Sequence, residues 1–316
     1  PGPTADDDAR LMAVAPYRHL VLPPASVRLD PARVRARIDA LPPLPKALAQ
    51  ALTMLHDDRT STAACAETIA RDQALTARTL RLANSAFYGV PGRVGTVRDA
   101  LHILGRRALG SLLTSSALAA QLPVHRCAGF DFGAFWTHAL GSAIAAQSLA
   151  VGSGLDADLA FTAGLLHDVG RLAMAAYFPE ALEAALAQAR DRDCSDLEME
   201  RTVVGIDHAQ VGGLIAARWH FPDDVVAAIR DHHAPPDPLA GGRRAPELTD
   251  LVHLANAIAH ALDLEGNADD RVPPIAFDAW ARVCAAPDEL LHAFARTEAG
   301  VAVLRDALDL PGGSKR

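Results

Sequence analysis

The stretch Phe161-Thr162-Ala163-Gly164-Leu165-Leu166-His167-Asp168-Val169-Gly170-Arg171 decides how this chain folds. It sets an adjacent histidine and aspartate inside an apolar run that is compatible with a helix. A carboxylate is costly to bury unless it is paired with another group or binds a cation. The pair His167–Asp168 is therefore the first candidate for chemistry in this protein.

Apolar residues recur at helical spacing on both sides of this stretch, and little of the chain alternates as a strand does. Thr96 followed by Asp99 resembles a capping box and predicts one long helix that ends near Leu122. Further helices are predicted over residues 157–166, 179–190, 197–204, 209–219, 222–232, 248–262, 277–285 and 287–308. The fold class is therefore all-α.

The chain divides where this periodicity lapses. An acidic, proline-containing start predicts a loosely ordered leader over residues 1–30. We expect an N-terminal helical module over residues 31–125 and a helical bundle over residues 126–310. A short Gly- and Lys-containing tail covers residues 311–316.

Composition limits the classes of partner. The chain of 316 residues has 30 basic and 38 acidic side chains and a net charge of -8, so there is no general electrostatic case for nucleic acid or an anionic membrane. Its four cysteines lie far apart and suggest neither disulfides nor a zinc knuckle. No apolar run is long enough to span a bilayer. We expect a cytoplasmic protein.

Six side chains in one half of the chain form a possible metal site. A single histidine on an apolar helix face is usually a hydrogen-bonded core residue, and this explanation suffices for His56, His102, His253, His260 and His292. Clustering favours ligation elsewhere, because imidazole and carboxylate groups from several helices can converge on a divalent ion such as Fe, Mn or Zn. The candidate ligands are His138, His167, Asp168, His208, His232 and His233.

The motifs around these residues resemble those of a known family. Together with the stretch quoted first, they are Gly205-Ile-Asp-His208-Ala-Gln-Val-Gly212, Trp219-His-Phe-Pro222 and Ile229-Arg-Asp-His232-His233. They resemble the HD-related output domain, HDOD, a divergent branch of the HD metal-dependent phosphohydrolases.

The N-terminal half carries further motifs of that family. They are Leu41-Pro-Pro-Leu-Pro45, Ile69-Ala-Arg-Asp72-Gln-Ala-Leu-Thr76, Leu82-Ala-Asn84-Ser85-Ala-Phe-Tyr88 and Thr96-Val-Arg-Asp-Ala-Leu101-His-Ile-Leu104-Gly105. The resemblance spans roughly residues 41 to 260. It implies a two-lobed helical protein related to bacterial signalling and regulatory components.

The resemblance also shows what this chain lacks. The related HD-GYP phosphodiesterases, which cleave cyclic di-GMP, have their histidine ligands and motif aspartate at positions that match all six candidates. This chain has Asn256 where such enzymes carry a late aspartate, and Ala134 where a bridging-metal enzyme carries a glutamate. Arg171 replaces a lysine, and no Gly-Tyr-Pro follows His233. Metal-assisted hydrolysis needs anionic ligands, and the loss of two carboxylates weakens the case for it.

Three interpretations follow. We favour a non-catalytic scaffold or sensor that acts through signalling proteins or a small ligand, so the chain is not predicted to be an enzyme. The first alternative is a working metal-dependent phosphohydrolase or cyclic-dinucleotide phosphodiesterase. The second is a receptor that binds a nucleotide second messenger without cleaving it.

A second candidate site draws on the N-terminal module. Arginines on amphipathic helices usually form a solvated face, but Arg106, Asn84 and Tyr88 lie in stretches that match the family module. With Arg171 from the bundle, they define a predicted groove for a protein partner or a small anion.

Overall fold

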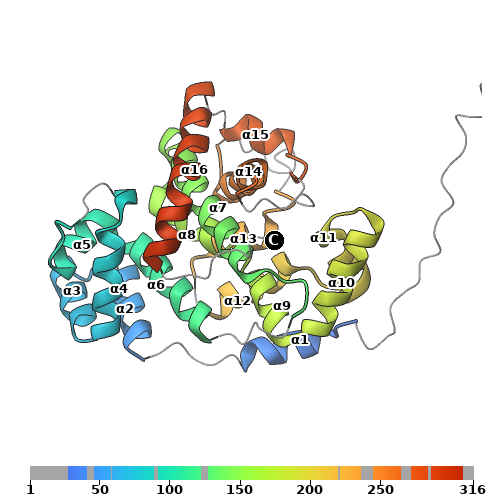
Figure 1. Cartoon of the computed structure of the whole chain (residues 1–316), viewed down its shortest axis with the longest axis horizontal. Helices are drawn as coiled ribbons and strands as arrows, with labels where there is room; N and C mark the ends of the chain where they lie inside the picture. The colour runs from blue at the N-terminus through green and yellow to red at the C-terminus, as the bar shows by residue number, and fades with distance from the viewer. Residues whose placement is uncertain are drawn as a thin grey trace, which may run out of the picture.

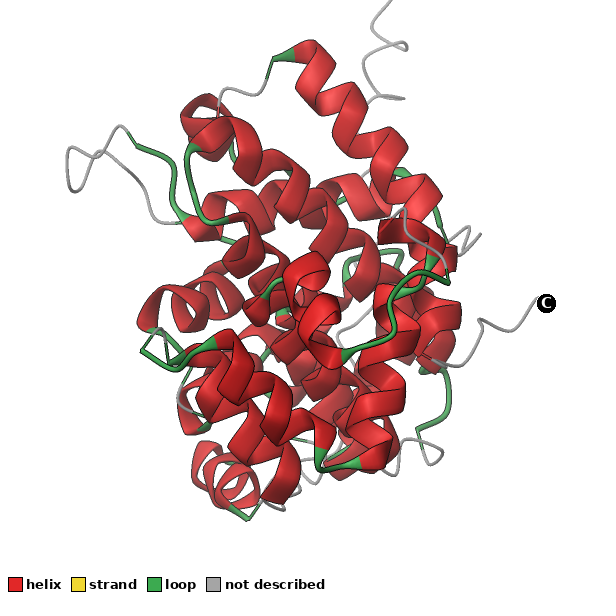
Figure 2. Cartoon of the chain, turned by 90° about the vertical axis from the view of Figure 1, so that its left-hand side faces the viewer, coloured by secondary structure: helices red, strands yellow, loops and turns green. Residues whose placement is uncertain are grey.

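The protein is helical in every regular element that the computed structural model describes. The structure describes residues 28–40, 46–57, 59–88, 92–121, 127–219, 221–235, 245–264, 272–283 and 286–308. Within these ranges there is no strand (Figure 2). The predicted all-α class is confirmed.

The first part of the chain folds into a group of short helices (left in Figure 1). They are α2 (Lys46–His56), α3 (Thr62–Ala70), α4 (Gln73–Ala83), the 3₁₀ turn η1 (Ala86–Tyr88), α5 (Val97–Leu104) and α6 (Arg106–Gln121). The first helix, α1 (Pro31–Asp39), lies apart from this group and contacts α12 (His208–Arg218) of the second part of the chain (Figure 1). The final residues of the expected loose leader are held in place. Leu29 is buried and its N–H donates to the carbonyl of Val204, while Asp30 caps α1. Residues 1–27 and 309–316 lie outside the described residues.

One helix prediction was wrong. Residues 97–121 form two helices rather than one, and they meet at Gly105. That glycine has φ +75°, a left-handed conformation that ends α5 and that side chains other than glycine rarely adopt. The start was predicted correctly, because the Thr96 hydroxyl accepts a hydrogen bond from the N–H of Asp99.

The second part of the chain is built around α7 (Phe132–Ser153). This helix is buried along most of its length and packs against α8, α14 and α16 (Figure 1). The other elements are α8 (Ala157–Leu166), α9 (Val169–Tyr177), α10 (Pro179–Arg192), α11 (Asp196–Met199), the π-helix η3 (Glu200–Val204), α12 (His208–Arg218), α13 (Asp223–Asp231), α14 (Leu248–Ala261), α15 (Phe277–Val283) and α16 (Pro287–Leu308).

The two parts share a hydrophobic core. One cluster of buried side chains runs from Leu55 on α2 through Trp136 on α7 to Leu304 on α16. The last helix, α16, packs along α7 and also contacts α4 and η1 (Figure 1). A second cluster lies among α7, α8, α13 and α14. The division near residue 125 stays a prediction, as do the limits of the two parts.

Two close helix contacts require glycine and set the geometry of the His–Asp stretch. A Cβ on Gly170 would lie 1.9 Å from the carbonyl oxygen of His208, and one on Gly164 would lie 2.7 Å from that of Ser142. Glycine therefore lets α9 contact the backbone of α12 and lets α8 contact α7. This contact brings Asp168, at the start of α9, next to His208, at the start of α12.

Replacing Gly170 by alanine should lower the free energy of unfolding by more than about 2 kcal/mol, because overpacking against movable side chains already costs roughly 1–3 kcal/mol. At Gly170 the atoms that the new Cβ would meet belong to the backbone of His208 and Gly212, which cannot move aside as a side chain can. Urea unfolding followed by circular dichroism measures the loss. Gly95→Ala is the control, since its Cβ would meet nothing within 4 Å. Equal stability of the two variants would contradict this account of Gly170.

Candidate metal centre

The six predicted ligands come from the ends or the interior of several helices. His138 lies within α7, His167 is the C-cap of α8, and Asp168 precedes α9. His208 begins α12, and His232 and His233 follow α13. Five of the six residues are buried, and His233 is half-buried.

The structure brings these residues together in two groups that share Asp168. One group contains Asp168, His208, His232 and His233, and the other contains His138, His167 and Asp168. Within each group one ligand atom from every residue lies within 4.8 Å of the others. No other group of this kind was found among the described residues.

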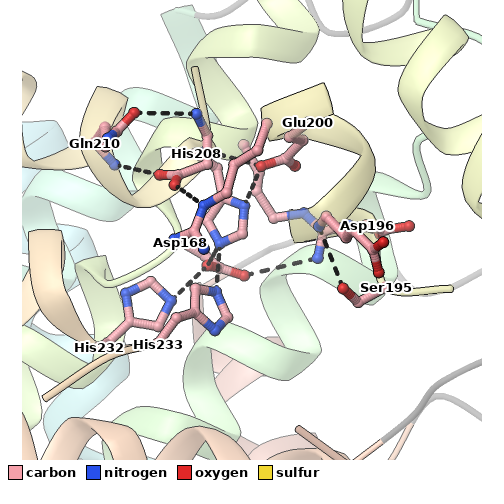
Figure 3. A network of polar contacts seen from close by, with 12 residues as sticks. Asp168, Ser195, Asp196, Glu200, His208, Gln210, His232 and His233 are labelled. Atoms are coloured by element: carbon pink, nitrogen blue, oxygen red, sulfur yellow. Dashed lines mark hydrogen bonds and ion pairs between the residues drawn. The ribbon is translucent and has the colours of Figure 1, made fainter. Parts of the chain in front are cut away.

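Asp168 occupies a helix N-cap position but does not act as a cap. A carboxylate in this position usually accepts a backbone N–H of the first turn, and Asp168 makes no such bond. Its Oδ1 instead lies 3.2 Å from Nε2 of His208 and 3.6 Å from Nε2 of both His167 and His232 (Figure 3). The side chain therefore faces the imidazoles.

In three of the imidazoles, the ring nitrogen that points away from Asp168 donates a hydrogen bond to a carbonyl or carboxylate oxygen. Nδ1–H of His167 donates to the carbonyl of Gly164 over 2.7 Å, and Nδ1–H of His232 donates to that of Ile229 over 2.8 Å. Nδ1–H of His208 donates to Oε2 of Glu200 over 2.6 Å. In His167 and His232 this bond fixes the tautomer and leaves Nε2 without a proton, and in His208 it directs Nε2 toward Asp168, as in metal-binding histidines with an outer acceptor.

Of two further distances between ring nitrogens, one falls within the range expected for neighbouring ligands of one metal ion and the other is slightly shorter. Nε2 of His208 lies 2.8 Å from Nε2 of His233, and Nε2 of His138 lies 3.3 Å from Nε2 of His167. Two ligands held about 2.1 Å from one metal ion lie roughly 3.0–3.4 Å apart for right-angle to tetrahedral arrangements.

At the site, the buried Nε2 of His232 lacks a hydrogen-bond partner. Unsatisfied polar atoms in a protein interior are costly. A cation would satisfy this nitrogen. The residues present therefore fit a divalent metal ion.

Burial and neighbouring charge set the protonation of the cluster. Burial lowers the pKa of His138, His167, His232 and His233 below the ordinary histidine value, so these imidazoles are neutral at pH 7. Burial opposes the charge on His208 too, but the carboxylates of Glu200 and Asp168 outweigh it and raise the pKa to about 10.

Arg171 lies at the edge of this site. Its guanidinium is 3.9 Å from Asp168 and 2.5 Å from Asp196. Burial opposes its charge, yet Asp196 and Asp168 hold the pKa of Arg171 above its ordinary value. The structure thus places this cation beside the shared carboxylate, where it would face an anionic ligand.

The other three residues of the predicted groove have structural contacts. Arg106 donates to the backbone carbonyls of Thr60 and Asp57 over 2.7 and 2.8 Å and also to that of Met54. These bonds tie the start of α6 to the end of α2. The Arg106 guanidinium thus faces backbone oxygens rather than an open groove.

Asn84 and Tyr88 lie in different surroundings. Asn84 bonds to the backbone of Leu80 and Val94. The Tyr88 hydroxyl is buried without a hydrogen-bond partner, and burial raises its pKa. A pocket of about 520 Å³ between α4 and α16 includes Asn84 in its lining but none of the other three residues. The groove stays a prediction.

Three residues near the cluster were missed from the sequence. Glu200 was not considered, although its position three and four residues before Val203 and Val204 puts it on an apolar helix face, where a carboxylate needs a partner. His253 is a hydrogen-bonded core residue, as expected, but its acceptor is the carbonyl of His232. The ring of His260 lies 4.4 Å from that of His138.

An all-helical fold with a shared aspartate among buried imidazoles is the arrangement of the HD class of proteins. The sequence model of the HDOD domain matches residues 41–235, so the chain belongs to the HDOD family. Among the described residues, no helix is both long and apolar enough to cross a membrane.

Solved structures share the fold. A Shewanella amazonensis SB2B protein provisionally named a phosphohydrolase is 29% identical with a TM-score of 0.69, covering 87% of this chain and 97% of that one. An HDOD protein of unknown function from Geobacter sulfurreducens is 21% identical with a TM-score of 0.65, covering 88% of this chain and 98% of that one.

A longer relative is also known. A Treponema pallidum protein without an assigned function is 26% identical over 266 residues, which are 82% of this chain. The chain spans about half the length of that relative.

Metal binding should be linked to the release of one proton from His208, because that imidazole is protonated at pH 7 in the metal-free protein whereas the other four are neutral. A ligand must lose its proton to bind a metal. The Kd for Co²⁺ should therefore fall about tenfold per pH unit between about pH 7 and 9. Chelator-competition titrations at three pH values measure this slope, and a Kd independent of pH would contradict it.

Proposed function

We propose that this HDOD protein is a signal-transduction module that binds a divalent metal in its His–Asp cluster and recognises an anionic ligand there without efficient hydrolysis. The convergence of six buried or half-buried donor groups, with Nε2 and Oδ1 atoms 2.8–3.6 Å apart, carries the proposal. The relatives named as signal-transduction or phosphohydrolase proteins give it context.

The ligand set favours particular metals. Five imidazole nitrogens and one carboxylate suit zinc, iron or manganese better than magnesium or calcium, which prefer oxygen ligands. The group with Asp168, His208, His232 and His233 offers four donors and is the stronger candidate. The group with His138, His167 and Asp168 offers three donors, so an ion there keeps open positions for a ligand.

An anion is the ligand that such a site would attract. A dication brings two positive charges to a ligand shell whose only carboxylate is Asp168, and Arg171 lies 3.9 Å from that carboxylate. Phosphate groups pair well with metal ions and with arginine. When bound, the metal would supply Lewis acidity at a phosphate oxygen. Arg171 would orient the anion, and a partner protein would then sense the occupied lobe.

Hydrolysis is the second candidate function. The sharing of Asp168 by two donor groups favours it, because two neighbouring metal ions can stabilise both the attacking and the leaving oxygen. Ala134 and Asn256 speak against it, because they supply no carboxylate. A receptor for a nucleotide second messenger without cleavage is one form of the first proposal.

Purified protein should retain about one to two equivalents of zinc, iron or manganese after dialysis, given the ligand types present. Elemental analysis measures the content. His232→Ala should lose most of the metal, since Nε2 of His232 is a buried donor without another partner. His102→Ala is the matched control, because that imidazole is exposed. A metal-free wild-type protein, or equal loss in both variants, would refute the metal site.

The metal-loaded protein should bind inorganic phosphate or a cyclic dinucleotide saturably in calorimetry, and Arg171→Ala should weaken this binding about tenfold or more, as charge-assisted contacts contribute roughly 1.5–3 kcal/mol. Bis(p-nitrophenyl) phosphate with Mn²⁺ or Fe²⁺ should show no turnover above background. Turnover that His167→Ala abolishes would instead support the hydrolase.

A further inference from the structure

Glu200 is a fully buried carboxylate that accepts both of its hydrogen bonds from His208, one of the candidate metal ligands. Its Oε2 accepts two hydrogen bonds from His208, one from the backbone N–H over 2.8 Å and one from Nδ1–H over 2.6 Å (Figure 3). Its Oε1 has no hydrogen-bond partner, and its side chain has no exposure to solvent. Among the described residues, no lysine or arginine lies within ion-pair distance of it, although Arg171 is near enough for the Glu200 charge to help raise the pKa of that guanidinium.

The local backbone places Glu200 specifically. It is the first residue of the π-helix η3, which ends at Gly205 with φ +88° before α12 begins at His208. Single π turns inside helical segments are rare and are frequent at functional sites. This turn puts the carboxylate against the ring of His208 on the side away from Asp168.

The net charge of the metal-bound cluster indicates what the Glu200 carboxylate contributes. Five neutral imidazoles and the single carboxylate of Asp168 leave excess positive charge when a dication binds. Excess charge in a buried site is costly unless it is compensated nearby. Neither Ala134 nor Asn256 supplies a carboxylate. The Glu200 carboxylate, however, bonds to one nitrogen of the His208 ring, and the other nitrogen of that ring faces the candidate metal position.

We propose that Glu200 is a positioning residue that supplies, from outside the ligand shell and through His208, the negative charge missing at positions 134 and 256. This inference rests on the proposed metal-binding function. The carboxylate fixes the His208 tautomer, directs Nε2 to the metal and makes that nitrogen a stronger donor. Outer carboxylates of this kind typically change metal affinity by roughly 10–100-fold.

The substitution Glu200→Gln isolates the charge. Both hydrogen bonds go to Oε2, so the glutamine carbonyl oxygen can accept both, while its amide nitrogen replaces Oε1, which has no partner. We expect the Kd for Co²⁺, taken from titrations at several pH values and corrected for competition with the His208 proton, to rise about 10–100-fold, with an unchanged number of sites and a shifted Co²⁺ absorption spectrum. A purely structural role would leave all three unchanged.

Two comparison variants make the test specific. Asp207→Asn neutralises a neighbouring buried carboxylate that pairs with Arg201 and caps α12 rather than bonding to the His208 ring, and it should leave Co²⁺ affinity unchanged. Glu200→Asp keeps the charge and should retain more affinity than Glu200→Gln. It also serves as the second variant should the glutamine protein fold poorly, with a Kd weakened no more than about threefold.

The outcomes separate this inference from the proposed function. Wild-type protein that binds Co²⁺ together with Glu200→Gln protein of equal affinity would overturn the role of Glu200 alone. Equal losses in Glu200→Gln and Asp207→Asn would overturn it as well, since the effect would then be general. Wild-type protein that binds no Co²⁺ would overturn both the proposed function and this inference.

Discussion

The buried carboxylate of Asp168 is the constraint on which the rest of the structure depends. Its Oδ1 lies among three imidazoles, and its helix-cap position is left without a capping bond. Burying a charge in this way is tolerated only when opposite charge compensates it. The close helix contact at Gly170 and the hydrogen-bond acceptors behind the rings of His167, His208 and His232 hold the neighbouring groups in place around this carboxylate.

The site combines features of an enzyme with the absence of groups that an enzyme of this class would need. Four of the five imidazoles are neutral at pH 7, and the aspartate is shared between two donor groups. A ligand shell with a single carboxylate carries little negative charge, so a bound dication keeps a net positive charge. This net charge favours binding of an external anion. We therefore propose a protein that detects a phosphate-containing ligand rather than one that hydrolyses it.

Much of this could be predicted from the sequence, for identifiable reasons. Helical periodicity predicted the all-α class. The clustering of histidines in one half of the chain and the family resemblance pointed to His138, His167 and His208, which the structure brings close to Asp168. The break at Gly105 could not be predicted, because a single glycine in a periodic apolar run does not reveal a positive φ. Glu200 was missed because its contact with His208 depends on a π turn, which has no simple sequence pattern. Whether the cluster binds a metal stays a prediction.

The most direct measurement is anomalous diffraction from crystals grown with Zn²⁺, recorded on both sides of the zinc absorption edge. The account requires a strong anomalous peak within about 2.0–2.2 Å of Nε2 of His208 and His232 and of an Asp168 carboxylate oxygen. A second, weaker peak is expected between His138 and His167. No peak in the cluster, together with the same side-chain positions, would contradict the central claim that these residues form a metal centre.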